Sequence, residues 1–312
     1  MRSPYRVAAG IIVTVVFLYL AFYNVNPHAF WMGIANYRLG WALGSVGLFA
    51  VSVLFRAFMW RVTTARMGAT PLSVLFGGVV VGYLGNNLLP LRAGEFVRTY
   101  YLSSRRGFPY AGVLSTVVVE RVTDVVVLGL LLAGGMLAGL GGLNRARGME
   151  ALGVMGAVLI LLCAAVLTLR FWGGPGAWRK WVGPHVEHFM APLANAGAKG
   201  TAVRILLFSA LAWAANWVSM LSLVSGLLSR GNLLTAALLL LLFVNLGVLI
   251  PSSPGAFGVM QLAFVAALYP FGVPKATAVA VSFIYQVAVY LFTLAVGIPY
   301  LLRARLRLGV MA

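Results

Sequence analysis

The sequence predicts an all-α polytopic membrane protein with about six full transmembrane helices and two re-entrant helical hairpins in an inverted repeat. Of its 312 residues, 62% are hydrophobic and 9% are charged. Several apolar runs reach about 20 residues, the length of helix that crosses a hydrocarbon core of about 30 Å. Two runs are broken by proline and glycine at corresponding places, which is typical of re-entrant hairpins. We expect residues 1–312 to form a single transmembrane domain.

The first two spans are predicted over residues 7–23 and 40–60. Basic residues precede the first span and place the amino terminus in the cytoplasm, because positive side chains gather on that side of the membrane. A short loop around Pro27 joins the two spans, and a cytoplasmic loop starts at Arg61.

The first re-entrant region is predicted at residues 72–106. An apolar run over residues 72–91 ends in asparagine and proline, and four arginines follow it: Arg92, Arg98, Arg105 and Arg106. A full crossing would place these arginines outside, against the charge bias. A hairpin that enters from the cytoplasm and returns to it keeps them on the cytoplasmic side.

The remaining spans are predicted over residues 111–140, 152–171, 202–228 and 276–302, with the second re-entrant region at residues 233–269. Residues 173–200 mix tryptophans with basic residues, which is typical of an interfacial segment. Arginines after the last span place the carboxyl terminus in the cytoplasm too, so the number of full crossings is even.

The net charge of +18 arises from 23 lysines and arginines against 5 acids. The basic residues lie in short loops and near the carboxyl end, so they fit anionic lipid head groups better than a nucleic-acid duplex. We expect no nucleic-acid partner. Cys163 is the single cysteine of the sequence, so it cannot form a thiolate metal site with a second cysteine. His185 and His188 lack a third convergent ligand, so we expect neither a metal nor another cofactor.

Ionisable residues are concentrated between positions 82 and 124. Three acids and three arginines lie there: Glu95, Glu120, Asp124, Arg92, Arg98 and Arg121. Such a group costs about 2.5–3.5 kcal/mol in the middle of a membrane helix on insertion scales, so it faces a partner or a wet cavity and marks function. Arg121 can reach Asp124 at helical i, i+3 spacing.

The two proline breaks align with each other. Residues 89–96 and 250–257 share proline, glycine and phenylalanine at the same spacing. Counted from the proline that opens the apolar run after each break, Arg121 aligns with Gln286, so the second copy keeps polarity and loses charge. Broken helices at corresponding places in two halves indicate a transporter site near the bilayer midplane.

Three motifs follow one another along the chain: Asn87-x-x-Pro90-x-Arg92-x-Gly94-Glu95-x-x-Arg98, Glu120-Arg121-x-x-Asp124 and Pro251-x-Ser253-Pro254-Gly255-x-x-Gly258. Through them the sequence resembles the flippase-like family that includes the transmembrane region of lysylphosphatidylglycerol synthases. The resemblance implies a multi-pass protein of a prokaryotic cytoplasmic (inner) membrane that moves lipids between leaflets, and some relatives are linked to lipid-dependent glycosylation. The bifunctional synthases add a cytosolic aminoacyl-transfer domain, which we do not expect here.

We expect a lipid translocase, either a flippase or a scramblase, that moves a phosphate-containing lipid, aminoacylated or polyprenyl. Arg92 and Arg98 would bind the lipid phosphate through bidentate, charge-assisted hydrogen bonds. Glu95 would pair with a cationic head group or carry a proton. The expected partners are membrane lipids with anionic or phosphate-bearing head groups. Whether the protein also forms a homo-oligomer is left open.

The predicted site residues fall into three groups. Those expected to bind substrate are Arg92, Glu95, Arg98, Arg121, Asn87, Ser252, Ser253 and Gln286. Those expected to form a proton relay or structural ion pairs are Glu120, Arg121 and Asp124. Those expected to break the hairpins are Pro90, Gly94, Pro251, Pro254 and Gly255.

Three other interpretations stay open. The arginines and acids could form a closed ion-pair network that only pins the first hairpin. A membrane-embedded glycosyl- or phosphoryl-transferase acting on a polyprenyl lipid would use one acid as a base, although the predicted loops are short for a nucleotide-binding domain. An ion-coupled small-solute transporter would use the same acids to bind protons. We expect transport rather than catalysis, and so no catalytic residue.

Overall fold

Every regular element in the described part of the chain is a helix, and no strand occurs there. The computed structural model describes residues 14–89, 93–137, 186–194, 196–228, 230–248 and 254–304. Three helices in these ranges are long and apolar enough to cross a membrane: α3 (Leu39–Thr64), α9 (Lys199–Ser225) and α12 (Lys275–Ala304). The chain is therefore a membrane-embedded, multi-pass helical protein. The total of six crossings and two re-entrant hairpins stays a prediction.

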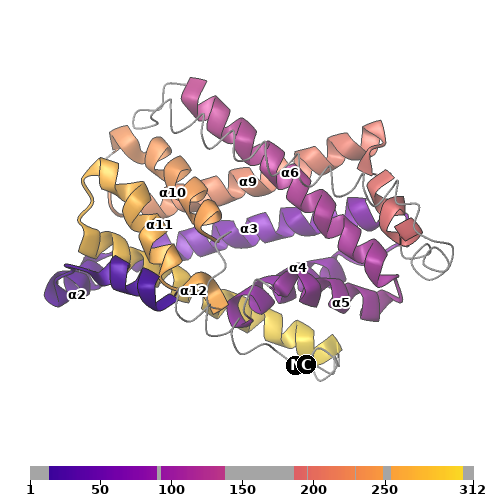
Figure 1. Ribbon diagram of the computed structural model, residues 1–312, viewed down its shortest axis with the longest axis horizontal. Coiled ribbons are helices and arrows are strands. Elements are labelled where there is room, and N and C mark those ends of the chain that lie inside the picture. The colour runs from indigo at the N-terminus through magenta and orange to yellow at the C-terminus, as the bar shows by residue number, and fades with distance from the viewer. Residues whose placement is uncertain are drawn as a thin grey trace.

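Helices α3 and α9 form the centre of the molecule and run side by side along its long axis (Figure 1). Ser45 Oγ lies 2.8 Å from Ser219 Oγ, and the ring of Phe58 stacks on that of Phe208 at a centroid distance of 5.5 Å. Early residues of α3 thus meet late residues of α9, so the two helices are antiparallel. Small hydroxyl side chains let their backbones approach closely and satisfy each other's hydrogen bonds.

Each central helix leads into a helical hairpin. Helices α4 (Leu72–Leu88) and α5 (Gly94–Arg106) form the first hairpin after α3. Helices α10 (Leu233–Val248) and α11 (Val259–Leu268) form the second hairpin after α9. The two hairpins lie toward opposite ends of the long axis, as expected when antiparallel helices precede them (Figure 1).

The broken ends of the two hairpins approach each other. The short 3-10 helix η3 (Pro254–Ala256) packs against α4. Asn87, near the end of α4, donates from Nδ2 to Thr293 Oγ1 of α12 at 2.9 Å. The breaks themselves, residues 90–92 and 249–253, lie outside the described residues. The two halves of the chain therefore meet close to both breaks.

A long helix follows each hairpin, α6 (Tyr110–Leu137) after the first and α12 after the second. Gly107 and Gly272 adopt left-handed backbone with φ of 68° and 73°, a conformation that glycine reaches without steric cost. Pro109 and Pro274 come two residues later and directly precede α6 and α12. The two halves thus share one order of elements with the same residues at corresponding junctions.

Gly94 is required by close packing in the first hairpin. A Cβ atom at this position would overlap Gly82 O and would lie 2.6 Å from Asn86 N. The Gly94 N–H donates to Asn86 Oδ1 at 3.0 Å. Its absent side chain is what allows the start of α5 to rest on the backbone of α4.

Two boundaries differ from the sequence prediction. The expected loop around Pro27 contains a helix, α2 (Pro27–Asn36). Asn26 caps this helix by accepting from His28 N at 2.8 Å, and proline fits the first helical position because its missing N–H would have no partner there. Arg61 lies in the last turn of α3 rather than in a loop, since that helix continues to Thr64.

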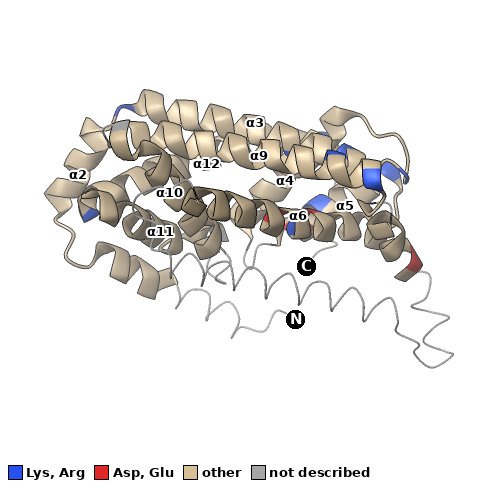
Figure 2. Ribbon diagram, turned by 90° about the horizontal axis from the view of Figure 1, so that it is seen from above, with Lys and Arg blue, Asp and Glu red and all other residues tan. Residues whose placement is uncertain are grey.

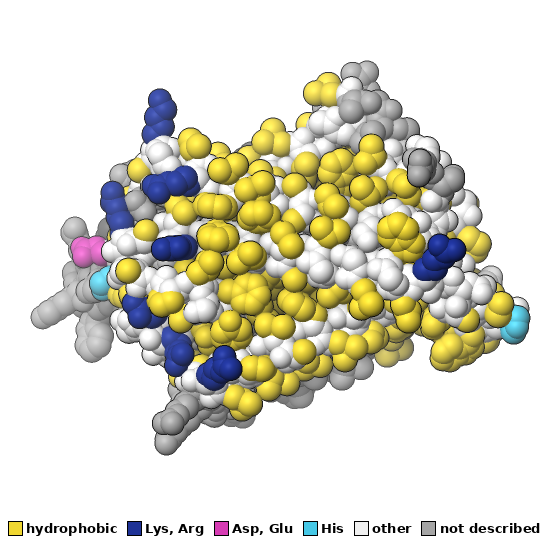
Figure 3. Space-filling view, turned by 180° about the vertical axis from the view of Figure 1, so that it is seen from behind, with side chains coloured by type: hydrophobic (Ala, Val, Ile, Leu, Met, Phe, Trp, Pro, Cys, Tyr) yellow, Lys and Arg dark blue, Asp and Glu magenta, His cyan; other side chains and the backbone are white. Residues whose placement is uncertain are grey.

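Positive side chains gather at one end of the long axis (Figures 2 and 3). That end holds the last turn of α3, the first turns of α9, and the ends of α5 and α12. Its exposed basic residues are Arg61, Arg66, Arg105, Arg106, Lys199, Arg204 and Arg303. Hydrophobic side chains cover the face between the ends in Figure 3, as expected where lipid chains surround the protein.

Candidate functional site

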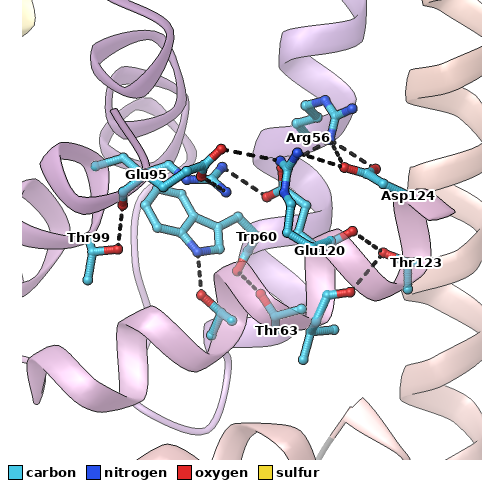
Figure 4. Close-up of polar contacts among 12 residues, drawn as sticks. Arg56, Trp60, Thr63, Glu95, Thr99, Glu120, Thr123 and Asp124 are labelled. Atoms are coloured by element: carbon cyan, nitrogen blue, oxygen red, sulfur yellow. Dashed lines mark hydrogen bonds and ion pairs between the residues drawn. The ribbon is translucent and has the colours of Figure 1, made fainter. Parts of the chain in front are cut away.

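Three carboxylates and three guanidinium groups meet where α3, α5 and α6 pack together (Figure 4). Helix α3 supplies Arg56, α5 supplies Glu95 and Arg98, and α6 supplies Glu120, Arg121 and Asp124. We call these six residues the ion-pair network. Their formal charges sum to zero. Arg56 lies eight residues before the end of α3, about 12 Å along the helix axis, so the network lies inside the hydrophobic thickness of the protein.

Glu120 is the centre of the network. Its Oε1 atom lies 3.0 Å from Arg56 Nη1 and 2.6 Å from Arg121 Nη2. Its Oε2 atom lies 2.9 Å from Arg98 Nη1. One carboxylate thus binds three guanidinium groups from three helices, which holds α5 and α3 against α6.

Asp124 lies one helical turn after Glu120 and contacts the same Nη1 atom of Arg56. Arg56 Nη1 lies 3.2 Å from Asp124 Oδ1, and Arg121 Nη1 lies 3.4 Å from Asp124 Oδ2. The indole Nε1–H of Trp213 in α9 donates to Asp124 Oδ1 at 2.8 Å. The network therefore reaches the second half of the chain through one tryptophan.

Two indole rings cover the buried arginines. The guanidinium carbon of Arg56 lies 5.1 Å from the ring centroid of Trp213, and that of Arg98 lies 5.5 Å from the ring of Trp60. Trp60 is itself fixed by a hydrogen bond from Nε1 to Thr116 Oγ1 of 2.7 Å. The faces of these rings favour the positive charges in surroundings that exclude water.

The network is buried on one side and accessible on the other. Arg56 and Arg98 have 4% of their side-chain surface exposed, and Glu120 and Asp124 have 2% and 6%. Glu95 is 23% exposed and Arg121 is 38% exposed. Arg98 Nη2 lies 2.6 Å from Glu95 Oε2, and Arg121 Nη2 lies 3.6 Å from Glu95 Oε1. A ligand would reach the network at Glu95 and Arg121.

Arg56 is not among the residues that the sequence analysis assigns to the site. A single arginine inside the apolar span at residues 40–60 is itself a signal, because such a residue is costly without a partner. Arg92, the third arginine of the predicted cluster, lies outside the described residues. Among the described residues, Arg56 supplies the third positive charge, so that three arginines balance three carboxylates.

The second hairpin has a neutral network where the first has charges. Gln286 of α12 accepts from Gln261 Nε2 at 2.7 Å and donates from Nε2 to Gly255 O at 2.7 Å. Gln261 Oε1 in turn accepts from Gly258 N at 2.6 Å. This chain of amides joins α12 to α11 and η3, so Gln286 holds the second hairpin as Glu120 holds the first.

The other predicted site residues divide into those that the structure describes and those outside it. Asn87 donates a hydrogen bond to Thr293, as described above, Gly94 packs against the backbone of α4, and Gly255 packs against the side chain of Tyr290. Five of the remaining predicted residues lie outside the described residues: Pro90, Arg92, Pro251, Ser252 and Ser253. The side chain of Pro254 is not described either.

A separate apolar groove of about 370 Å³ lies on the outer surface between α2, α3 and α12. Leu43, Phe283 and Leu291 are among its lining side chains. Leu43 lies 13 residues before Arg56, about 20 Å along α3, so the groove is not part of the ion-pair network.

Comparison with known proteins gives two findings. A family model described as "Lysylphosphatidylglycerol synthase TM region" matches residues 7–297. A protein of Haloferax volcanii named "Glycosyltransferase AglD" is 25% identical over 319 residues, which takes in 88% of this chain and 51% of that protein. The chain therefore spans about half the length of that relative.

Proposed function

Because the chain belongs to the lysylphosphatidylglycerol synthase transmembrane-region family, we propose that it is a lipid translocase that moves a phosphate-bearing lipid between leaflets. The observation that carries this proposal is the ion-pair network, in which Arg121 is 38% exposed and which we place at the depth of the hydrocarbon core. Ionisable groups at that depth are rare, and an accessible one indicates a path for a polar group.

The proposed topology has six full crossings and two re-entrant hairpins, with the basic end of the molecule in the cytoplasm of a prokaryote and the protein in its inner membrane. Helices α4 and α5 would then enter from the cytoplasmic side, and α10 and α11 from the opposite side. Both termini would lie in the cytoplasm. This arrangement places the two breaks near the middle of the membrane, where a transporter built from inverted repeats binds its cargo.

In the proposed mechanism, the head group passes between the hairpins while the hydrocarbon tails stay in the bilayer. Arg121 binds the phosphate because its guanidinium presents a fork of donors to two phosphate oxygens. The buried amide chain around Gln286 would hold the second hairpin on the other half of the path. Anionic or phosphate-bearing membrane lipids are the proposed partners. Assembly of the protein into a homo-oligomer stays a prediction.

The test is transfer of a tail-labelled phospholipid between leaflets of reconstituted vesicles, followed by quenching the label in the outer leaflet. We expect the protein to raise the fraction that is quenched beyond one half. Arg121→Gln and Asp124→Asn should lower the transfer rate at least about tenfold, because each removes a charged partner from the network. Arg204→Gln, an exposed change in α9, is the matched control and should transfer at the original rate. If folded Arg121→Gln and Asp124→Asn transfer lipid at the rate of the unmodified protein, the ion-pair network is not the transport site.

A second candidate is a transferase that acts on a polyprenyl lipid, and the name of the Haloferax volcanii relative favours it. Glu95 is the acid of the network that a substrate would reach, since it is 23% exposed. The discriminating assay incubates the purified protein with a polyprenyl phosphate and an activated sugar donor. A glycosylated lipid product that disappears in Glu95→Gln would establish the transferase, whereas lipid transfer without product would establish the translocase.

A further inference from the structure

The apolar groove between α2, α3 and α12 has no part in the ion-pair network. Its volume is about 370 Å³, and all of its lining residues are apolar. Four of them, Leu39, Leu43, Val287 and Leu291, have between 51% and 69% of their surface exposed. Large apolar side chains that gather around a hollow mark a surface that another apolar molecule covers.

The groove begins at one end of the molecule and runs inward. Helix α2, which contributes Ile34 to the groove, lies at the end of the long axis away from α5 and the basic residues (Figures 1 and 2). Trp31 of the same helix is 65% exposed, and exposed tryptophan is typical of the membrane–water interface. On α12 the lining runs from Phe283 to Leu291, about 12 Å along the helix. With α2 at the interface, the groove extends from the level of the head groups into the hydrocarbon.

A positive charge lies at the interfacial end of the groove. Arg38 has an exposed side chain and directly precedes Leu39, the lining residue with which α3 begins. The start of α3 has no side-chain cap, so the first backbone N–H groups of this helix favour an anion as well. A guanidinium group binds phosphate through charge-assisted hydrogen bonds. The surface thus offers a place for an anion next to a place for hydrocarbon.

A second copy of the chain is the alternative occupant of this surface. In a two-fold symmetric pair, the second copy would present the same surface, including its own Arg38. Two positive charges would then meet at the interface. A phospholipid instead brings a phosphate to Arg38 and an acyl chain to the groove, so the complementarity of charge favours the lipid.

We propose that this surface binds one phospholipid, with its phosphate at Arg38 and one acyl chain in the groove. The lipid belongs to the leaflet at the end of the molecule opposite the basic residues. The site is separate from the ion-pair network, because Leu43 lies about 20 Å from Arg56 along α3. It requires only that the chain is embedded in a membrane, so it goes beyond the proposed translocase function.

The test uses vesicles that contain the protein and phosphatidylglycerol with a photoreactive diazirine on one acyl chain. After irradiation, mass spectrometry of peptides measures the label at Val287 in the groove and at Leu207 on α9, which have nearly equal exposure, 51% and 52%. We expect about threefold more label at Val287, because a chain in a groove is contacted from several sides. A diacylglycerol with the same photoreactive chain should label Val287 about fivefold less, since it lacks the phosphate that Arg38 attracts.

Two pairs of variants separate the roles of the groove and of the charge. Ala288→Phe fills the groove and should reduce the label at Val287 to the level at Leu207. Ala210→Phe makes the same change at an exposed position of α9 and should leave the label at Val287 unchanged. Arg38→Gln should lower the label from phosphatidylglycerol about fivefold, whereas Arg38→Lys, which keeps the charge, should retain most of it.

Equal label at Val287 and Leu207 in the unmodified protein would overturn the proposal, because the groove would then hold lipid no better than the rest of the surface. Equal label from phosphatidylglycerol and diacylglycerol would overturn the role of Arg38. An unlabelled groove in a protein whose copies cross-link through a cysteine at position 43 would assign the surface to a second copy instead. The comparison of the two positions needs no variant, and it follows binding rather than transfer, so its outcome is independent of the translocase assay.

Discussion

The Nη1 atom of Arg56 lies 3.0 Å from Oε1 of Glu120, a residue 64 positions later in the chain. Both side chains are almost fully buried, and each has at least one further partner of opposite charge. This pair joins the central helix α3 to α6, the helix that follows the first hairpin. Two other arginines share the same carboxylate, so the pair is the core of a larger network.

Arg56→Gln should destabilise the folded protein by about 3–5 kcal/mol, because it leaves buried carboxylates without one of their cations. Thermal unfolding in detergent, followed by intrinsic fluorescence, measures the effect. Arg61→Gln changes an exposed arginine in the same helix and should stay within about 0.5 kcal/mol of the original protein. Equal midpoints for the two variants would show that the pair contributes nothing to stability.

The double variant Arg56→Gln/Asp124→Asn should be less destabilised than the sum of its two single variants. Removing both partners leaves fewer unpaired charges than removing either one, since Arg56 Nη1 lies 3.2 Å from Asp124 Oδ1. The same unfolding assay, run as a double-mutant cycle, gives the coupling. Additive effects would mean that the two residues act independently.

Gly94→Ala should disrupt the first hairpin, because the added Cβ would overlap Gly82 O and the backbone must move to relieve the contact. Overpacking of this kind costs about 1–3 kcal/mol or more. Gly134→Ala in α6 is the control, since no atom lies within 4 Å of its added Cβ. We expect a lower unfolding midpoint for Gly94→Ala and an unchanged or higher one for Gly134→Ala. The opposite order would contradict the packing described here.

Gln286→Leu should loosen the second hairpin while leaving the first intact. The change leaves Gly255 O and Gln261 Nε2 without their partner, a loss of about 1–3 kcal/mol for each buried polar group. Hydrogen exchange by mass spectrometry should show faster exchange over residues 254–268. Val287→Ala, at an exposed position of the same helix, should leave the exchange unchanged. Faster exchange across the whole chain would instead indicate a global loss of stability.

A short cross-link between positions 87 and 293 should stop transport if the two halves separate when a head group passes. The native contact there is a hydrogen bond of 2.9 Å from Asn87 Nδ2 to Thr293 Oγ1. The experiment places cysteines at both positions in a Cys163→Ser background and joins them with a reducible, bifunctional thiol reagent. We expect transfer to fall on cross-linking and to return on reduction. Single-cysteine variants treated in the same way should keep their activity, and full transfer by the cross-linked protein would exclude separation at this contact.

The positions of several helices in the described part of the chain could be predicted from the sequence. The breaks at residues 90–92 and 249–253 lie outside the described residues and stay predictions. The first hairpin was expected to end at Arg106 and the second near Tyr269, and α5 ends at Arg106 and α11 at Leu268. Local rules explain this success, because proline and glycine act on the backbone of their own segment. The helix at Pro27–Asn36 was missed, since ten residues are too few for an apolar run to identify.

The sequence by itself determined that this is a helical membrane protein, because the length of an apolar helix and the hydrogen bonding of its backbone depend on each segment alone. Only the tertiary structure decided which charges meet. Arg56 reaches Asp124 across 68 residues, and Trp213 reaches the same carboxylate across 89. Such partners depend on how α3, α6 and α9 pack around one another, and helical spacing along one segment carries no information about that packing.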